Sequence, residues 1–460
     1  METFDVLVIG SGSGMHIVEN ALMEDMTVAL VEMGPLGGTC LNRGCIPSKM
    51  IIYPMDVVQM IRGAEKLGIK ARIDSIDFKF IMRRMRELIE NDRHQIEEGV
   101  ENTPNLKLFR GRGEFVSDYT LSVSSGDLVK AENIFIVSGA RTLIPPIKGL
   151  DKIEYLTSEN IWNMEEPPKS MVIVGGGFVG VEFAHFFSTM GAEVTLISKS
   201  PKLVKDAEPE ISDLLLKLMR RSMKVETGLE AVEVERKNNL INIKAIDTIN
   251  GSVKTFSAEA LFIASGRKPN SDIIRPEKTG VETNEKGFVI VDDYFRTSKE
   301  RIWSFGDVIG KAMFKHVANY EAEIVWNNFI GRKMLKVDYD KIPYAVYSYP
   351  QIASVGLTEK KAKERGYKFL VGEYYYKDTA RGAAMAVEDG FVKVLIDENT
   401  RKLLGCHIIG PYAPEIIQEA ITVMNCEGGT YFPIVRSMHI HPCMSEVLQF
   451  AFTNLHRHEH

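Results

Sequence analysis

The chain has 460 residues, which is too long for one ordinary domain and long enough for three. Hydrophobic residues make up 45% and charged residues 26%, the balance of a soluble globular protein, and no apolar run approaches the roughly 20 residues that a membrane span needs. The lack of such a run argues against a membrane protein, and the net charge of −6 with no basic block argues against nucleic acid as the main partner.

The N-terminal residues predict a strand, a glycine turn, a helix and a second strand. We expect the strands from Phe4 to Gly10 and from Val28 to Glu32, with a helix reaching about Asp25 between them. Such an arrangement outlines a dinucleotide-binding βαβ unit. The start METFDVLVIG has neither a basic region nor a cleavage site, so we do not expect export.

The first glycine turn contains Gly10, Gly12 and Gly14. Glycines here suit a tight turn and the close approach of a pyrophosphate to the start of a helix. The last position of the usual fingerprint is Met15, so the helix and the strand must pack differently there. A glycine turn alone could be an ordinary loop. Glu32, which can accept hydrogen bonds from a ribose diol, favours nucleotide binding.

Five cysteines, an odd number, do not suggest the disulfide framework of a secreted protein. Cys40 and Cys45 lie five positions apart in GGTCLNRGCIPSK, a spacing that permits a disulfide and suggests redox chemistry in a reducing compartment. We therefore expect a cytoplasmic protein.

Cys45 is predicted to be the thiol with the lower pKa. Pro47 suits a first helical turn, which places Cys45 near the positive end of a helix. Zinc binding is the alternative, but one cysteine pair without a nearby histidine or second pair is poor zinc spacing. We expect no metal site.

A second strand, glycine turn, helix and strand unit follows a long helical region. Residues 50–103 are predicted to be helical because apolar residues recur at helical spacing through FKFIMRRMRELIE. Proline-rich stretches at 143–150 and 165–170 then precede the second unit. Its elements are expected from Met171 to Gly175, up to Met190 and from Glu193 to Ser198.

The second glycine turn is a complete GxGxxG formed by Gly175, Gly177 and Gly180, so two nucleotides can bind at once. Its second strand ends at Ser198 rather than at an acid, and cations follow. A carboxylate would repel a 2′-phosphate, whereas hydroxyl and ammonium groups favour one, so we predict NADPH as the coenzyme. A solvated basic loop is the alternative. The cations are Lys199, Lys202 and Lys205.

A histidine and a carboxylate, His441 and Glu446, stand close together in HIHPCMSE. A histidine can remove or return a thiol proton near neutral pH, and a carboxylate can hold the imidazole and stabilise its charged form. On their own, such neighbours on a surface usually have no function.

GGTCLNRGCIPSK resembles the active-site segment of the class I pyridine nucleotide-disulfide oxidoreductases, and the similarity extends over nearly the whole chain. This family includes dihydrolipoamide dehydrogenase, glutathione reductase, mycothione reductase and mercuric reductase. The resemblance implies an α/β fold with two Rossmann-like dinucleotide-binding domains and a C-terminal α+β dimerisation domain. We expect the FAD-binding domain at 1–150 and 271–340, the NAD(P)-binding domain at 151–270 and the dimerisation domain at 341–460.

Further motifs resemble the cofactor-binding segments of this family. VSGAR at 137–141 and ASGRKPN at 264–270 resemble its connections, SFGD at 304–307 the motif whose aspartate contacts the FAD ribitol, and KHVA at 315–318 a helix start beside the flavin. FAD contacts are implied at Gly10, Gly12, Gly14, Glu32, Gly38, Thr39, Ser138, Gly139, Gly306, Asp307 and Ala318. NAD(P) contacts are implied at Gly175, Gly177, Gly180, Ser198, Lys199, Lys205, Gly266 and Arg267.

The resemblance also implies how the reaction is organised. Lys49 and Glu182 match an ion pair near the reactive flavin nitrogen. YPQIASVGLTE at 349–359 resembles the opening of the dimerisation domain, and the implied homodimer brings His441 and Glu446 to the partner subunit's cysteines. Cys443 stands where the family usually has threonine, and we interpret it as a small structural replacement rather than a third redox thiol.

The implied reaction carries electrons from NADPH through FAD to a disulfide between Cys40 and Cys45. Cys45, nearer the flavin, would hold the charge-transfer thiolate, Cys40 would attack a small disulfide substrate, and His441 would shuttle the proton. The sequence does not identify the small thiol. Oxidation of dihydrolipoamide with NAD would run the same steps in reverse and stays open as an alternative.

Within the family, Met15, IRGAEKLGIKARID at 61–74 and KHVANYEAE at 315–323 look most like mycothione reductases. Dihydrolipoamide dehydrogenases normally keep an acid at the Ser198 position. Mercuric reductase needs a vicinal cysteine pair that the tail FTNLHRHEH lacks. A non-catalytic flavoprotein would lack a cysteine, Lys49 or His441, and all are present. The histidines His456, His458 and His460 are expected in a loose tail rather than in a site.

Overall fold

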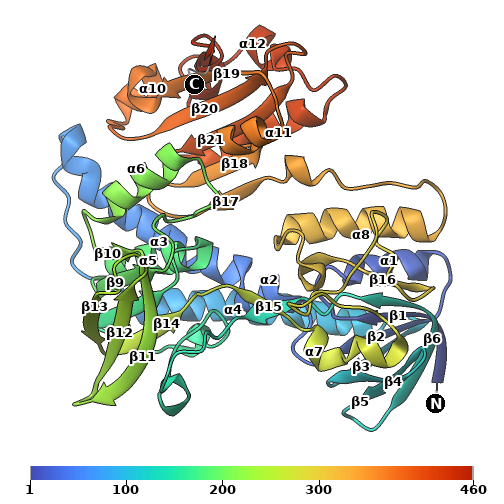
Figure 1. Cartoon of the computed structure of the whole chain (residues 1–460). Coiled ribbons are helices and arrows are strands. Elements are labelled where there is room, and N and C mark those ends of the chain that lie inside the picture. Colours follow the sequence, from blue (N-terminus) through green and yellow to red (C-terminus); the bar gives the residue numbers. More distant parts are fainter. Residues whose placement is uncertain (1, 458–460) are drawn as a thin grey trace.

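The computed structural model describes residues 2–457. Figure 1 shows a C-terminal β-sheet above two further sheets, one containing β1 and the other containing β9. Among the helices of the described residues, none is both long and apolar enough to cross a membrane.

The first sheet has seven strands in the order β3-β2-β1-β6-β5-β4, with β16 also paired to β6. Its central strands are parallel, and β4 and β5 add an antiparallel edge. Val6 to Ile9 form a continuous buried apolar run, which is typical of strands covered on both faces. The strands are β1 (Glu2–Ile9), β2 (Val28–Glu32), β3 (Leu106–Arg110), β4 (Gly113–Ser117), β5 (Thr120–Val123), β6 (Leu128–Ile136) and β16 (Ile302–Ser304).

Two helices distant in sequence cover the same part of this sheet. α1 (Met15–Met23) packs against α8 (Lys315–Phe329), and Figure 1 shows both above β1. The predicted strands and helix therefore form, with ends within two residues of those expected. Because β16 pairs with β6, the chain returns to the first sheet after the second unit.

The region predicted as one helical stretch at 50–103 is divided, so that prediction was partly wrong. α2 (Gly38–Arg43) and α3 (Cys45–Gly63) meet at Gly44, and a short 3₁₀ turn ends at Gly68, whose φ of +79° does not continue a helix. Residues 69–77 then run without regular structure. α4 (Phe78–Glu101) starts where the Asp77 side chain accepts a hydrogen bond from the Phe80 N–H.

The second nucleotide-binding-like unit forms a parallel four-stranded sheet in the order β10-β9-β8-β14. Buried residues of α5 pack on one face, and a three-stranded antiparallel sheet, β11-β12-β13, packs on the other through Ile241 and Ile243. The helices are α5 (Phe178–Met190) and α6 (Pro209–Met219). The strands are β8 (Ser170–Val174), β9 (Glu193–Ser198), β10 (Lys224–Thr227), β11 (Leu229–Lys237), β12 (Leu240–Asp247), β13 (Val253–Ala258) and β14 (Ala260–Ile263).

The two predicted connections lie side by side between these sheets. β7 (Ala140–Thr142) and β15 (Arg267–Pro269) form an antiparallel two-stranded sheet, in which Thr142 pairs with Arg267. The short helix α7 (Ser271–Ile274) follows, and the Arg141 guanidinium pairs with Asp272 at 2.6 Å. The chain thus leaves and re-enters the second unit at one place.

The C-terminal sheet is antiparallel, with the order β17-β18-β21-β20-β19-β22. Its strands are β17 (Tyr344–Val346), β18 (Ile352–Gly356), β19 (Phe369–Tyr375), β20 (Phe391–Asp397), β21 (Leu403–Ile409) and β22 (His456–Arg457). Its helices are α9 (Glu359–Glu364), α10 (Ala380–Ala384), α11 (Ala413–Asn425), α12 (Phe432–Arg436) and α13 (Glu446–Ala451).

The expectation of a loose tail was wrong for His456. This residue pairs with Val371 in β19, because the outer edge of β19 offers unpaired backbone groups to a strand. His458 and His460 lie outside the described residues.

Candidate active site and cofactor sites

Cys40 and Cys45 lie at the meeting point of two helices. Cys40 is in α2, and Cys45 is the first residue of α3, as the proline two positions later predicted. Both are free thiols, and the Cys40 thiol donates a hydrogen bond to the Cys45 sulfur. This hydrogen bond is the largest cause that lowers the pKa of Cys45 to about 6, with the Lys49 ammonium adding to it against partial desolvation. The same hydrogen bond raises the pKa of Cys40.

The predicted ion pair links α3 to α5 beside the thiols. Lys49 Nζ lies 2.9 Å from Glu182 Oε2 and 3.1 Å from Oε1. Glu182 is 6% exposed and also accepts the Tyr347 N–H, while the Lys49 ammonium lies 4.5 Å from the centre of the Tyr347 ring. These contacts fix the Lys49 ammonium next to Cys45, where it helps to lower the pKa of that thiol.

A second ammonium, that of Lys315, lies near the cysteines, and the sequence did not predict a role for it. Lys315, the first residue of α8, donates to Ser13 Oγ at 3.1 Å, and Ser13 Oγ donates to Asn319 Oδ1 at 2.8 Å. Burial lowers the pKa of Lys315, and the electrostatic influence of Cys40 and Cys45 opposes that change. The four-residue spacing from 315 to 319, which puts both side chains on one helix face, was the available signal.

The carboxylate of Glu32 closes the first glycine turn. It accepts the Ser11 N–H at 2.8 Å and the Ser11 hydroxyl at 2.7 Å, and its other oxygen accepts the Gly34 N–H at 2.8 Å. Ser11 was missed because the fingerprint leaves that position variable. The glutamate is therefore fixed at the end of β2, where a bound ribose would meet it.

The close packing expected of a third glycine has moved by one residue. A Cβ on Gly14 would lie 2.3 Å from the Gly10 carbonyl oxygen, and a Cβ on Gly180 would lie 1.8 Å from the Gly175 carbonyl oxygen. Gly14 thus does in the first turn what Gly180 does in the second. The helix and the strand therefore approach each other at Gly14, one residue before Met15.

A small cavity lies at the carboxyl ends of β1 and β2, where the sequence places several of the predicted FAD contacts. Ser138 Oγ is buried there without a hydrogen-bond partner among the described residues, and Asn270 donates to the Ser138 carbonyl at 2.8 Å. A Cβ on Gly38 would lie 2.6 Å from the Gly12 Cα, so the glycine turn and the start of α2 are in contact. Of the predicted FAD residues, the cavity is lined by Gly10, Glu32 and Ser138, while Gly139 adjoins it and Thr39 is exposed beside Cys40.

A buried network holds the predicted ribitol-binding turn. The Gly306 N–H donates to Glu321 Oε2 at 2.7 Å, and the Tyr339 hydroxyl donates to Glu321 Oε1 at 2.6 Å. Burial raises the pKa of Glu321 to about 7 and also raises the pKa of Asp307. Ala318 packs against Gly306. Neither Glu321 nor Tyr339 was singled out from the sequence.

Arg267, which was predicted to contact NAD(P), lies next to the turn that contains Asp307. Its Nε is 3.4 Å from Asp307 Oδ2, and its guanidinium donates to the Ala140 carbonyl. Gly266, beside it, has a φ of +125° that favours glycine. The expected contact of these two residues with NAD(P) stays a prediction.

The residues predicted to select the coenzyme differ in their burial and in their ion pairs. Ser198 is 2% exposed, and a Cβ on Gly176 would lie 2.6 Å from its hydroxyl oxygen. Lys199 Nζ pairs with Glu230 at 2.8 Å. Lys205 is exposed, and no ion-pair partner for it occurs among residues 2–457. A Cβ on Gly177 would meet nothing within 4 Å, so the turn is open at that position, whereas a Cβ on Gly175 would lie 2.2 Å from the Ala264 carbonyl oxygen.

His441 and Glu446 are brought together as the sequence predicted. Nδ1 of His441 lies 2.8 Å from Oε1 of Glu446, whose other oxygen accepts the Cys443 N–H at 2.9 Å. Burial alone would raise the pKa of Glu446, but these hydrogen bonds outweigh it and hold the pKa below its ordinary value. The Cys443 sulfur lies 3.0 Å from Ser445 Oγ.

Comparison with known proteins shows the family. Residues 4–322 match the family described as pyridine nucleotide-disulphide oxidoreductase, and residues 342–452 match its dimerisation domain. The protein belongs to this family, as the sequence motifs indicated. The family implies FAD and a nicotinamide cofactor, and the second match supports a homodimer.

Similar proteins include three different enzymes of this family. The chain is 34% identical to mycothione reductase from Mycobacterium tuberculosis over 99% of this chain and all of that protein. It is 31% identical to mercuric reductase from Bacillus cereus over 97% of this chain and 71% of that protein. It is 30% identical to dihydrolipoyl dehydrogenase from Chlamydia muridarum over 97% and 95%, respectively.

A solved structure of another protein has a similar fold. The HOCl-induced flavoprotein disulfide reductase RclA from Escherichia coli superimposes with a TM-score of 0.86 at 26% identity, covering 98% of this chain and 99% of that one. The expected α/β architecture with Rossmann-like sheets and a dimerisation domain is therefore confirmed, and the protein is an oxidoreductase of the flavoprotein disulfide type.

Proposed function

We propose that the protein is an FAD-dependent NADPH:disulfide oxidoreductase that reduces a low-molecular-weight disulfide through Cys40 and Cys45. The observation that carries this proposal is the hydrogen-bonded thiol pair with its low-pKa member at the start of α3, beside Lys49. Such a thiol is ionised at neutral pH and is suited to disulfide exchange. The similarity to mycothione reductase supports a small thiol disulfide as the substrate class.

The chain's own residues fit the positions that FAD would need. The cavity with Ser138 and Glu32, the turn at Gly306 and Asp307, and the glycine contacts around Gly12 would hold it. When bound, FAD supplies the transfer of an electron pair from the nicotinamide to the cysteine pair. Gly175, Gly177 and Gly180 would hold the nicotinamide nucleotide.

Cys40, Cys45 and His441 can together account for the electrons and protons of the disulfide exchange. The partner subunit's His441 takes the proton of the Cys40 thiol, whose sulfur attacks one sulfur of the substrate disulfide, and the imidazolium then returns that proton to the leaving sulfur. The Cys45 thiolate then attacks the Cys40 sulfur, which forms the intrachain disulfide and releases the second half of the substrate as a thiolate that takes a proton from solvent. The substrate is reduced by two electrons and the cysteine pair is oxidised by two. Lys49 holds Cys45 as the thiolate before attack.

A dihydrolipoamide dehydrogenase that uses NAD is the second candidate. The pairing of Lys199 with Glu230 favours it, because an ammonium that is already neutralised contributes less to binding a 2′-phosphate. The buried Ser198 hydroxyl and the unpaired Lys205 support NADPH instead. Domain boundaries at 1–150 with 271–340, 151–270 and 341–460 are part of the proposal.

Steady-state assays with both nucleotides test the proposal. Purified enzyme would be assayed with NADPH and NADH against low-molecular-weight disulfides and lipoamide, and in reverse with dihydrolipoamide and NAD. NADPH-dependent disulfide reduction that is lost in Cys45→Ser supports the proposal. Faster turnover of dihydrolipoamide with NAD than of any disulfide with NADPH would move the protein to the second candidate.

A further inference from the structure

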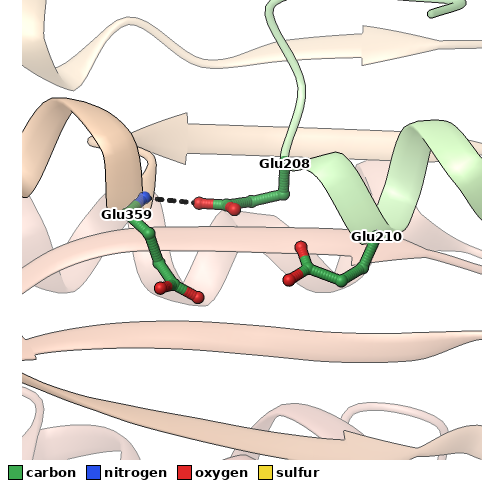
Figure 2. Close-up of side chains that lie close together, drawn as sticks. All are labelled: Glu208, Glu210 and Glu359. Carbon is green, nitrogen blue, oxygen red and sulfur yellow. Dashed lines mark hydrogen bonds between the residues drawn. The ribbon is translucent and has the colours of Figure 1, made fainter. Parts of the chain in front are cut away.

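A buried cluster of charged side chains joins the second nucleotide-binding unit to the C-terminal sheet. The Lys393 ammonium, on β20 and 1% exposed, lies 3.5 Å from Glu208 and 3.1 Å from Glu210. It also contacts Glu359 at the start of α9. Figure 2 shows Glu208 and Glu210 coming from the start of α6 and facing Glu359 across the boundary.

The three carboxylates do not require a metal ion. Their oxygens lie within 4.8 Å of one another, a spacing that could hold a cation. However, the Lys393 ammonium is in contact with all three, so the chain supplies the cation itself. Buried ion pairs are weak evidence for stability, because well-packed apolar side chains often hold such a boundary equally well, so we ask what this cluster positions.

Glu208 is the member that fixes a backbone position across the boundary. It is fully buried, and its Oε1 accepts the backbone N–H of Glu359 at 2.6 Å, as the dashed line in Figure 2 shows. His407 Nε2 lies 3.8 Å from the same oxygen. Burial raises the pKa of Glu208, and the Lys393 ammonium opposes this change.

Glu208 ends the segment that begins after Ser198 and carries the predicted coenzyme-selecting lysines. This segment, residues 199–208, folds back over the second glycine turn, where the Val204 N–H donates to the Gly176 carbonyl at 2.8 Å. Val204 has a φ of +45°, which a β-branched residue adopts only when its surroundings impose it. The segment is therefore held at both ends, by β9 and by the buried cluster.

We propose that Glu208 is a positioning residue for coenzyme selection: its contacts with Glu359 and Lys393 hold residues 199–207 so that the 2′-phosphate of NADPH meets Ser198 and Lys205. This inference rests on the proposed function and extends it to a residue on the far side of the loop. The same contacts join the coenzyme site to the domain that carries His441.

The test measures binding of both nucleotides to the FAD-loaded enzyme. Glu208→Ala removes the contact across the boundary, Glu208→Gln keeps an oxygen that can accept the Glu359 N–H, and Glu210→Ala is the matched control from the same cluster. We expect Glu208→Ala to raise the Kd for NADPH about tenfold and to leave the Kd for NADH within about twofold. Glu208→Gln and Glu210→Ala should keep most of the NADPH preference.

Two results would overturn the inference: an unchanged ratio of the two dissociation constants in Glu208→Ala, or an equal loss for both nucleotides, which indicates a merely structural role. If Glu208→Ala does not fold, Glu208→Asp, which keeps the charge and shortens its reach, takes its place with the same outcomes. Wild-type enzyme that binds neither nucleotide contradicts the proposed function itself and the inference with it.

Discussion

Nδ1 of His441 lies 2.8 Å from Oε1 of Glu446, and the two side chains differ sharply in exposure, at 70% for the histidine and 6% for the glutamate. The carboxylate is fixed within the C-terminal domain, and it holds the imidazole by one nitrogen. Nε2 is left for a group outside this hydrogen bond. This geometry suits a base that acts on atoms supplied by another chain.

Replacement of His441 by alanine should slow disulfide turnover by roughly 10²-fold or more, the usual scale for losing a positioned acid–base group. Flavin reduction by NADPH, followed by stopped-flow absorbance, should be nearly unchanged because that half-reaction does not use the imidazole. Glu446→Gln should have a smaller effect in the same direction.

Mixed dimers show which chain supplies this base. When Cys45→Ser and His441→Ala chains are combined, one site of each heterodimer should contain both an intact cysteine pair and an intact histidine. Recovered activity in purified heterodimers supports a site shared between subunits. Heterodimers that stay inactive would place the base in the same chain as its cysteines.

Replacement of Cys45 by serine should leave FAD bound and abolish disulfide reduction. The long-wavelength charge-transfer absorbance of the two-electron-reduced enzyme should also disappear, because it needs the Cys45 thiolate. Oxidation of NADPH by a quinone acceptor should persist and serves as the control for a folded flavoprotein. Normal disulfide turnover by this variant is incompatible with the assigned role.

The ionisation of Cys45 can be measured in the reduced enzyme. The rate of alkylation by iodoacetamide should rise with pH around a midpoint of about 6, because the thiolate is the nucleophile and the pKa of Cys45 is lowered to about 6. Lys49→Met should move the midpoint upward, since it removes a cation that stabilises the thiolate. Lys244→Met, which alters an exposed lysine on β12, should leave it in place and is the matched control.

The two lysines of the coenzyme loop should contribute unequally. We expect wild-type enzyme to prefer NADPH by about tenfold in kcat/KM. Lys205→Ala should lose more of this preference than Lys199→Ala, because Lys199 already pairs with Glu230. Glu230→Ala should increase the preference by freeing Lys199, and higher ionic strength should reduce it in every variant. Equal losses in the two lysine variants would contradict this ranking.

The stability of the protein should depend on Glu321. Its pKa rises from an ordinary 4.5 to about 7, so between these values the folded state binds a proton that the unfolded state has lost. Stability should therefore fall as the pH rises through this window, by roughly 3 kcal/mol, and stay level above it. Glu321→Gln, which cannot ionise, should lack this decline in thermal melts of the FAD-loaded protein. If the stabilities of the wild-type and Glu321→Gln proteins changed in parallel with pH, Glu321 would not be the group responsible for the decline.

Local patterns predicted the two nucleotide-binding-like units because glycine turns and apolar runs set their form within short segments. The β1 and β9 strands, the start of α3 and the ion pair of Lys49 with Glu182 all form as expected. The division of the helical region at Gly68 was missed, since apolar periodicity continues through residues that a glycine turn separates. Periodicity reports which face is apolar and not where the backbone changes direction.

The residues that the sequence did not single out depend on tertiary contacts. Glu321 meets Gly306 across fifteen positions of sequence, and Lys393 meets Glu208 across 185. No spacing rule connects such pairs, so the buried networks that hold the turn at Asp307 and the coenzyme loop became visible only in the folded chain. By contrast, His441 and Glu446 were predictable because they lie five positions apart.

The pairing of His456 and Arg457 with β19 has a practical consequence for handling the protein. These residues cover part of the outer edge of the C-terminal sheet, an edge that would otherwise present unpaired N–H and C=O groups to another molecule. Arg457 also anchors to Glu398 through its guanidinium. Removal of residues 456 and 457 should therefore expose the backbone groups of Leu370 and Val371 in β19 and favour pairing of this edge with another molecule.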